Sequence, residues 1–516
     1  MSGLLAKKPL RAAATEGESQ HLKRVLGPWA LTAMGIGGII GTGIFVATGE
    51  VAKNVAGPAL MMSYVVAGIT CLFAALCYAE YAAMTPVAGS AYTYAYTTLG
   101  EIFAWIIGWD LILEYAIGAA TVANGWSSYF QRILGKLHIT LPDAISKAPL
   151  AYDDGAFSLT NGIINLPAVL IVMILTAILV KGIKESSTVN AILVAIKVGA
   201  VVFVILVGAF YVNSSNWEPF APYGWTGINV FGYEVAGQHT EKGKPLGMIA
   251  GAALIFFAYI GFDAVSTQAE EAKDPQRNVP FGILASLLIC TVLYVAVVAV
   301  LTGMVHYEQI DEKAGVATAF DQVGLKWVDA LVAAAAIAGI TSVLLVLLIG
   351  SARVIMAMSR DGLLWQFLAS IHPTFRTPWV GSIIIGLFVA MFAGVLPLGA
   401  LLELTNIGTL FAFAVVCAAV LVLRYTDAAH PRPFRVPAAH AVCVLGVLLC
   451  LLLMLSLPAQ NWYRLFVWMI LGLIIYATYG IRHSVVRGGP PVPLPPAPPP
   501  PTPEQADYGD LNGPAR

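Results

Sequence analysis

Two short stretches rich in glycine or carrying a carboxylate interrupt apolar segments of membrane length. The first, residues 35–45 (GIGGIIGTGIF), contains five glycines and a threonine, and the second, residues 256–263 (FFAYIGFD), contains a glycine and an aspartate. Unpaired backbone N–H and C=O groups are costly in hydrocarbon, so a broken helix is tolerated there only where it faces protein or a cavity. Two such breaks about half a chain apart are typical of a secondary transporter, with the binding site at the breaks.

The two breaks offer complementary backbone groups. Glycine lets the chain leave helical φ/ψ, and the helix that follows presents free N–H groups and the positive end of its dipole, which suit a carboxylate. Thr42 and Gly43 lie where these donors point. In the second break, Phe257, Ala258 and Ile260 would turn carbonyls toward the same space, and carbonyls suit an ammonium group. Both groups occur on the backbone of an amino acid. Close helix packing is the alternative reading of one such stretch, but the pair favours binding.

Lys197 lies inside the apolar run 189–212 with no acidic residue within two turns of sequence. Ionisable residues in membrane spans are costly and usually functional. Burial in a low dielectric disfavours the charged form of an amine, so a buried lysine can carry and release a proton. Snorkelling to the membrane surface is the alternative. We expect Lys197 to couple transport to protons.

Three of the carboxylates within predicted spans are further candidates for a role in the site. Asp110 and Glu114 are four residues apart and share one helix face, and we expect Glu114 to line the interior while Asp110 makes a structural hydrogen bond. Asp263 follows Gly261 and could cap the second half of its broken helix. The histidines show no ligand-like spacing, so the sequence predicts no metal site, no hydrolytic constellation and no catalytic residue.

Composition places the chain in a bilayer. Hydrophobic residues make up 58% of 516 residues and charged residues 11%, with a mean hydropathy of +0.79. Windows of about 20 apolar residues predict twelve spans. They are 29–46, 58–82, 102–130, 164–180, 189–212, 248–269, 281–303, 327–358, 379–395, 400–423, 439–457 and 463–481.

The basic residues predict the orientation. With the N-terminus inside, the inner segments hold about twice as many Lys and Arg as the outer ones, which favours both termini in the cytoplasm. We therefore divide the chain into a cytoplasmic N-terminal segment (1–28) without a cleaved signal peptide, a transmembrane domain (29–483) and a Pro-rich tail (484–516). The tail should be extended or disordered, passive or bound weakly by a partner that recognises P-x-x-P. The outer loops 131–162 and 213–247 show no strand periodicity.

Six long motifs resemble the amino acid/polyamine/organocation superfamily, and specifically a bacterial member of its cationic amino acid transporter group. The resemblance covers about 27–481, with the motifs in matching order. They are GIGGIIGTGIF, YAEYAAMTPVAGSAYTYAYTTLGE, GWDLILEYAIGAATVANGW, FAYIGFDAVSTQAEEAKDPQRNVP, AGITSVLLVLLIGSARVIMAMSRDGLL and PFRVP. The resemblance implies an all-α integral membrane protein with about 12 transmembrane helices: a leucine-transporter-like 5+5 inverted repeat, broken helices 1 and 6, and two extra helices.

The resemblance also implies a set of site residues. Ile39, Gly41, Thr42 and Gly43 of helix 1 would surround the substrate backbone together with Phe257, Ala258 and Ile260 of helix 6, with Asp263 just beyond. Lys197 matches a helix-5 lysine that replaces sodium in proton-coupled members, and its expected contacts are carbonyls near Gly41 and the hydroxyl of Thr341 or Ser342. Ile340 near the side-chain pocket would disfavour a long cationic substrate.

These observations predict a secondary active transporter for proton-coupled uptake of small neutral, alanine-like L-amino acids by alternating access. The expected partners are the amino acid, protons and the lipid bilayer of the inner (plasma) membrane, with no nucleic acid and no cofactor. A cationic amino acid transporter or exchanger and an amino acid sensor on a transporter scaffold remain alternatives. A sodium symporter would share the fold, but a cation at position 197 should repel sodium.

Overall fold

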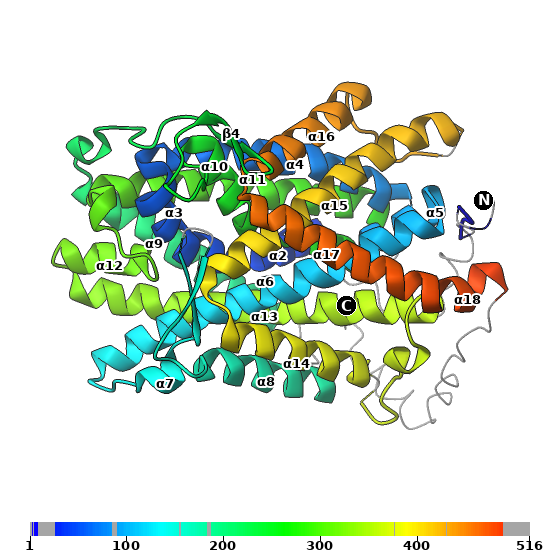
Figure 1. The fold of residues 1–516 in the computed structure, drawn as a ribbon, viewed down its shortest axis with the longest axis horizontal. Helices are drawn as coiled ribbons and strands as arrows, with labels where there is room; N and C mark the ends of the chain where they lie inside the picture. Colours follow the sequence, from blue (N-terminus) through cyan, green and yellow to red (C-terminus); the bar gives the residue numbers. More distant parts are fainter. Residues whose placement is uncertain are drawn as a thin grey trace, which may run out of the picture.

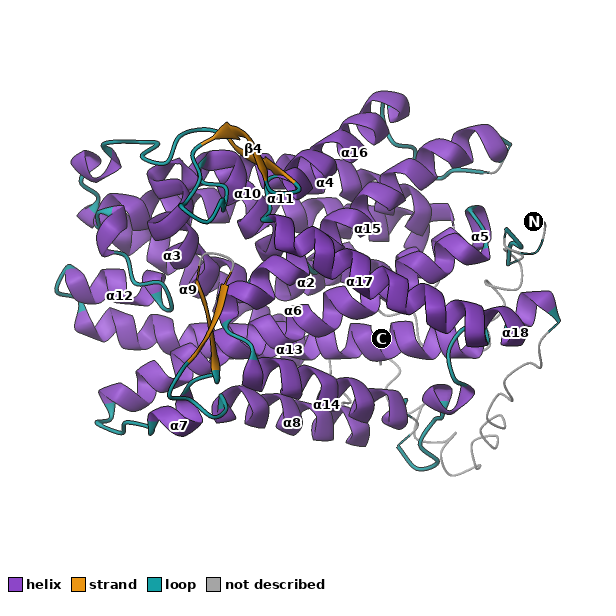
Figure 2. Ribbon diagram, in the orientation of Figure 1, coloured by secondary structure: helices purple, strands orange, loops and turns teal. Residues whose placement is uncertain are grey.

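The computed structural model describes residues 3, 5–8, 26–84, 90–153, 156–182, 187–375, 377–429 and 431–488. The Pro-rich stretch 489–516 and most of the segment before Leu26 lie outside the described residues, so the expectations for them stay predictions. Long helices running side by side dominate the described part (Figure 1), and strands are confined to two short hairpins (Figure 2).

The helices of the first half are α2 (Pro28–Ile39), α3 (Thr48–Val51), α4 (Leu60–Met84), α5 (Ser90–Thr98), α6 (Glu101–Lys136), α7 (Asp143–Ser146), α8 (Leu166–Lys181) and α9 (Ser187–Gly208). Those of the second half are α10 (Met248–Ile255), α11 (Pro275–Met304), α12 (Gly315–Gln322), α13 (Lys326–Arg360), α14 (Trp379–Val395), α15 (Leu398–Thr426), α16 (Ala439–Leu455), α17 (Ala459–Ile475) and α18 (Ile481–His483).

The predicted all-α membrane class is confirmed. Among the described residues, eight helices are long and apolar enough to cross a membrane, and three shorter apolar helices, α8, α14 and α16, add to them. The first predicted span is divided between α2 and a helix that resumes as a π-helical stretch at Gly43–Ala47. The break lies in the glycine-rich stretch, as the sequence predicts, and the larger differences from the predicted spans are at α6, which runs on to Lys136, and α11, which begins at Pro275.

Helix pairings repeat with a shift of five helices. Numbering the spans in order, helix 3 (α6) packs on helix 8 (α13), helix 4 (α8) on helix 9 (α14), and helix 2 (α4) on helix 7 (α11). Helix 5 (α9) packs on helix 1 (α2), as helix 10 (α15) packs on helix 6 (α10). Helix 5 also contacts helix 8 (α13), as helix 10 contacts helix 3 (α6). This is the pattern of two five-helix repeats, with α16 and α17 as the extra helices. It brings the two breaks together.

The two long loops contain strands that the sequence did not predict. β1 (Leu150–Asp153) pairs antiparallel with β2 (Ala156–Leu159), and β3 (Gly227–Val230) pairs with β4 (Tyr233–Gly237) across a bulge. Each strand has four or five residues, too few for a period of two to stand out from the surrounding loop. We call the end of the molecule that carries them the hairpin end.

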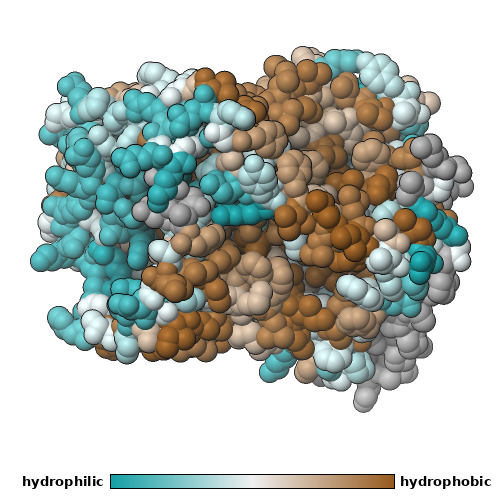
Figure 3. Space-filling view, viewed as in Figure 1, coloured by the Kyte–Doolittle hydropathy of each residue, from teal (hydrophilic) through white to brown (hydrophobic). Residues whose placement is uncertain are grey.

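The molecular surface carries a broad hydrophobic area over the helices (Figure 3), beside a hydrophilic hairpin end on the left. Large apolar side chains are exposed on its helices, for example Leu170 and Ile174 of α8 and Ile470 and Ile474 of α17. A water-soluble protein rarely exposes such contiguous apolar surface, so these faces suit lipid.

Helix α17 is tied to α6 by a reciprocal tryptophan pair. Trp109 Nε1 donates to the Trp468 carbonyl at 2.8 Å, Trp468 Nε1 donates to the Trp109 carbonyl at 3.1 Å, and the rings stack with centroids 4.4 Å apart. The stack continues to Trp105 and Tyr476. In lipid, where apolar burial drives little helix association, such hydrogen bonds and close packing hold helices together.

We expect Gly472→Val to lower the melting temperature of the purified protein by a few degrees while leaving substrate affinity unchanged. A Cβ at Gly472 would lie 2.4 Å from Cδ1 of Trp109, so the side chain forces α17 away from α6. Thermal unfolding followed by fluorescence measures the effect. Gly135→Val on α6, where a Cβ meets nothing within 4 Å, is the control. Equal melting temperatures for the two variants would contradict the anchoring role.

Candidate substrate-binding site

The first break separates α2 from the helix that follows. α2 ends at Ile39, and Ile40 is extended, with φ −72° and ψ 106°. The chain is helical again at Thr42, and the π-helical stretch begins at Gly43. The residue that leaves the helical region is Ile40, and none of the glycines in GIGGIIGTGIF has a positive φ. Their lack of a side chain matters instead for close packing at the break. As the sequence predicts for helix 1, the broken span lies in the protein interior, with residues 35–49 all buried.

The second break is built around Gly261. α10 ends at Ile255, a 3₁₀ turn covers Phe256–Tyr259, and Ile260 is extended before Gly261 at φ +115°. Only glycine adopts that φ without strain. A 3₁₀ helix then runs from Asp263 to Glu271. Helix 6 is thus discontinuous, as expected.

The two breaks touch each other through glycines. A Cβ on Gly261 would lie 2.6 Å from the Gly38 carbonyl oxygen, and a Cβ on Gly43 would lie 2.3 Å from Cα of Ala258. Both distances are shorter than any Cβ contact in proteins. Glycine at these positions therefore lets the main chains of helices 1 and 6 approach to contact, and their free backbone groups come to one place.

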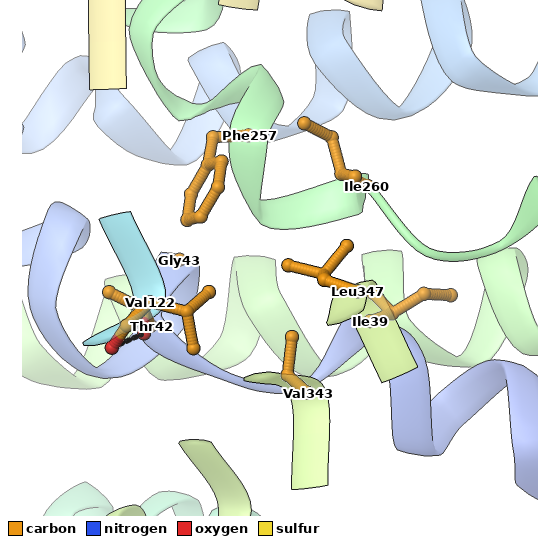
Figure 4. Close-up of a pocket in the computed structure, with 8 residues that line it drawn as sticks. All are labelled: Ile39, Thr42, Gly43, Val122, Phe257, Ile260, Val343 and Leu347. Carbon is orange, nitrogen blue, oxygen red and sulfur yellow. Dashed lines mark hydrogen bonds between the residues drawn. The ribbon is translucent and has the colours of Figure 1, made fainter. Parts of the chain in front are cut away.

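A small cavity lies at this junction (Figure 4). In Figure 4 the Phe257 ring extends from the helix-6 turn into the space above Gly43 and Val122. The lining residues come from helices 1, 3, 6 and 8: Ile39, Thr42, Gly43, Val122, Phe257, Ile260, Val343 and Leu347. Thr42 is the polar side chain of this lining, and its hydroxyl lies 3.5 Å from the Val122 carbonyl oxygen; the other lining side chains are apolar. Its volume of about 10 Å³ is room for roughly one water, so a substrate side chain has to displace these walls.

The remaining residues expected at the substrate lie directly behind this lining. Gly41 packs under Val343, where a Cβ would come within 2.7 Å of the valine, and Ala258 contacts Gly43. Ile340 is fully buried on α13, three residues before Val343. Sequence reasoning missed Val122, Val343 and Leu347. Helical periodicity could have found the last two, because residues at i, i+3 and i+7 from Ile340 share a face.

Lys197 reaches the end of α2 from α9. Its side chain is 1% exposed, and Nζ donates to the Gly37 carbonyl at 2.7 Å and to the Ser342 hydroxyl at 3.1 Å. Gly37 is in the last turn of α2, whose carbonyls lack partners within the helix. Thr341, the other hydroxyl considered, donates to the Ile337 carbonyl and accepts from Trp126 Nε1. The lysine therefore joins helix 5, helix 8 and the first break.

Three buried carboxylates belong to this region: Asp110 and Glu114 of α6, and Asp263 at the start of the 3₁₀ helix that follows the second break. Asp263 accepts from the Tyr115 hydroxyl and, at 3.3 Å, from the Gly261 amide, the contacts of a residue that caps the break. Glu114 on α6 interacts electrostatically with Asp263 and Asp110. Both side chains are fully buried; within the described residues, the carboxylate oxygens of Asp110 have no hydrogen-bond partner, whereas Glu114 has the Thr409 hydroxyl beside it. Asp110 thus lacks the structural hydrogen bond that we expected for it.

Comparison with known proteins agrees with this architecture. A family model described as "Amino acid permease" matches residues 26–476. The chain is 46% identical over 475 residues to the branched-chain amino acid permease BcaP of Bacillus subtilis (strain 168), covering 92% of this chain and 96% of the relative. It is 43% identical over 486 residues to a methylthioribose transporter of the same organism, covering 94% and 100%. The vacuolar cationic amino acid transporter 4 of Arabidopsis thaliana is 37% identical over 406 residues, covering 78% and 64%.

Proposed function

We propose, because this chain belongs to the amino acid permease family, that it carries neutral aliphatic amino acids, from alanine to the branched-chain residues, with protons as the coupling ion. The observation that carries the proposal is the lining of the cavity. Apart from Thr42, every side chain that lines it is apolar, while the main chains of the two breaks supply further polar groups.

The division between polar backbone and apolar side chains matches such a substrate. The helix that resumes near Gly43 offers amide N–H groups to a carboxylate, and the turn at Phe257 and Ala258 offers carbonyls to an ammonium group. The substrate side chain would then enter the space between Val122, Val343 and Leu347. A guanidinium or lysine ammonium there would lose hydration without a charged partner, which costs several kcal/mol. The name of the branched-chain permease relative favours the same class.

Lys197 supports coupling to protons. Among the described residues, its ammonium bonds to two neutral oxygens, the Gly37 carbonyl and the Ser342 hydroxyl. When protonated it holds the end of α2 against helices 5 and 8, and when neutral it donates at most weakly, so the two protonation states favour different arrangements of helix 1. A sodium ion at the same place would be repelled by the charged form.

Uptake into proteoliposomes tests the proposal. We expect an inward proton gradient, without sodium, to drive accumulation of radiolabelled leucine and alanine, and excess unlabelled valine or isoleucine to compete better than arginine. Accumulation that requires sodium would overturn proton coupling. Preferential competition by arginine would favour a cationic amino acid transporter, and binding without uptake would favour a sensor.

Methylthioribose is a second candidate substrate because one relative named for its transport aligns over its whole length. This thiosugar has neither a carboxylate nor an ammonium group, so it would use the breaks through hydroxyls. Competition by methylthioribose against leucine in the same vesicles distinguishes the two. Strong competition by methylthioribose and none by branched-chain amino acids would replace the amino acid proposal.

The proposal includes the plasma membrane with both termini cytoplasmic, which the excess of Lys and Arg in the corresponding segments supports. The hairpin end would then face outward. Protease accessibility of a tag placed at either terminus, in sealed cells and after lysis, tests the orientation.

We expect Leu347→Ala to shift selectivity toward larger neutral amino acids. Removing this side chain from the cavity wall makes room beside Val343, so methionine and phenylalanine should gain on alanine by roughly tenfold, the scale of a change of a few methylene groups. Ratios of inhibition constants against leucine uptake measure the shift. Ile340→Ala is made for comparison, because Ile340 lies on the same face of α13, three residues before Val343, but does not line the cavity. An unchanged ratio in Leu347→Ala would remove Leu347 from the side-chain pocket.

A further inference from the structure

One hydroxyl group meets both helix breaks. Tyr294 is fully buried in α11, and its Oη lies 2.9 Å from the Ile39 carbonyl oxygen and 3.2 Å from the Ala258 carbonyl oxygen. Ile39 is the last residue of α2, and Ala258 lies in the 3₁₀ turn that ends the first half of helix 6. Tyr294 therefore contacts the carbonyl end of both half-helices.

These carbonyls need a donor from elsewhere. The last four C=O groups of a helix have no partner within it, and a buried carbonyl left without one costs about 1–3 kcal/mol. A phenol has a single proton, so the Tyr294 hydroxyl serves two acceptors with one shared donor. Both distances lie within hydrogen-bond range, and the hydroxyl can serve both acceptors only while the two carbonyls remain close to each other.

The ring of Tyr294 is fixed from the opposite side. It makes edge contacts with Tyr64 of α4, at a centroid distance of 5.4 Å, and with Tyr259 of helix 6, at 5.6 Å. The Tyr259 hydroxyl in turn donates to the Tyr64 carbonyl at 2.8 Å. This cluster of three tyrosines, Tyr64, Tyr259 and Tyr294, belongs to helices 2, 6 and 7. The hydroxyl is thus held at a defined position relative to both breaks.

Tyr294 and Lys197 bind the same end of α2 in different ways. Lys197 comes from α9 and donates to Gly37, two residues before Ile39. A lysine ammonium group can lose its proton and then donates only a weak hydrogen bond, whereas a phenol keeps its proton at neutral pH. The bond from α11 therefore persists when the bond from α9 is released.

We propose that Tyr294 is a positioning residue that keeps the two breaks at a fixed spacing throughout the transport cycle. The spacing it sets is the distance between the amide groups of helix 1, which would hold the substrate carboxylate, and the carbonyls of helix 6, which would hold its ammonium group. The change in the KM for leucine that this inference predicts rests on the proposed function, whereas the change in amide hydrogen exchange does not.

Tyr294→Phe removes the hydroxyl and keeps the ring. In proteoliposomes we expect the KM for leucine to rise roughly tenfold, because the helix-1 amides and the helix-6 carbonyls lose their fixed spacing. We expect kcat to change little, because the helices that move during transport are otherwise unaltered. In the purified full-length protein in lipid nanodiscs, amide hydrogen exchange should become faster in both 36–43 and 256–261.

Tyr81→Phe is the matched control. It also removes one buried tyrosine hydroxyl, but the partner of that hydroxyl is Thr98 of α5, outside both breaks and outside the cluster of three tyrosines. We expect a similar loss of melting temperature, an unchanged KM for leucine, and unchanged exchange in 36–43.

Two results would overturn the inference: exchange in both segments of Tyr294→Phe equal to that of the parent, or an equal rise in KM in the two variants. Failure of the parent protein to bind any amino acid would overturn the proposed function instead, and the exchange comparison would still decide the role of Tyr294.

Discussion

Replacing Lys197 with alanine is expected to abolish accumulation driven by a pH gradient while substrate binding persists. The ammonium group that joins Gly37 of α2 to Ser342 of α13 disappears, so protonation can no longer distinguish two arrangements of helix 1. Substrate still meets the helix-1 amides and the helix-6 carbonyls, which belong to the main chain. Leucine accumulation under an imposed proton gradient, together with leucine binding by thermal shift, measures both effects.

Two further lysine variants sharpen this test. Lys197→Arg keeps the charge but cannot release a proton, so it should bind leucine and accumulate none. Lys181→Ala removes an exposed lysine at the end of α8 and should behave as the parent does. Parent-level accumulation by Lys197→Ala under a pH gradient would show that the coupling proton is carried elsewhere.

Replacing Gly43 with valine is expected to weaken amino acid binding by at least roughly ten- to a hundredfold, since forced overpacking costs about 1–3 kcal/mol or more. Its Cβ would lie 2.3 Å from Cα and 2.4 Å from Cβ of Ala258. Backbone cannot move aside as a flexible side chain can, so helices 1 and 6 have to separate at the cavity. Leucine binding to the detergent-purified protein, by calorimetry or thermal shift, measures the loss.

The control for this variant is Gly199→Val on α9, where a Cβ meets nothing within 4 Å. It places the same side chain in a membrane span without disturbing the breaks, and its affinity should equal that of the parent. Gly43→Ala, with its smaller added volume, guards against a Gly43→Val protein that fails to fold. A folded Gly43→Ala protein with parent affinity would mean that the contact between Gly43 and Ala258 does not shape the site.

The sequence was most informative where backbone rather than side chains makes the site. The glycines at 35–43 and Gly261 interrupt apolar runs, and both runs are broken in the structure. The fold class and family followed from the same breaks and from the long motifs, and both are confirmed. Lys197 also stood out because a charge inside an apolar span is rare.

Side chains that act from far along the chain could not be predicted in the same way. Tyr294 is an ordinary tyrosine in an apolar run, and only the repeat geometry brings its hydroxyl to Ile39 and Ala258. The hairpin strands were missed because short pairs in loops carry little periodicity. Val122 gives no signal of its own, since an apolar residue in a membrane helix is expected on any face.

The narrow cavity between helices 1, 3, 6 and 8 has a pharmacological consequence. A compound that matches the amino acid backbone but carries a side chain too bulky for the walls to close around would still occupy the two breaks. It would hold the walls apart and halt turnover, acting as a competitive blocker rather than as cargo. On the proposed binding mode, the boundary between substrates and blockers among analogues of increasing side-chain volume would be set by closure of Val122, Val343 and Leu347 around the ligand.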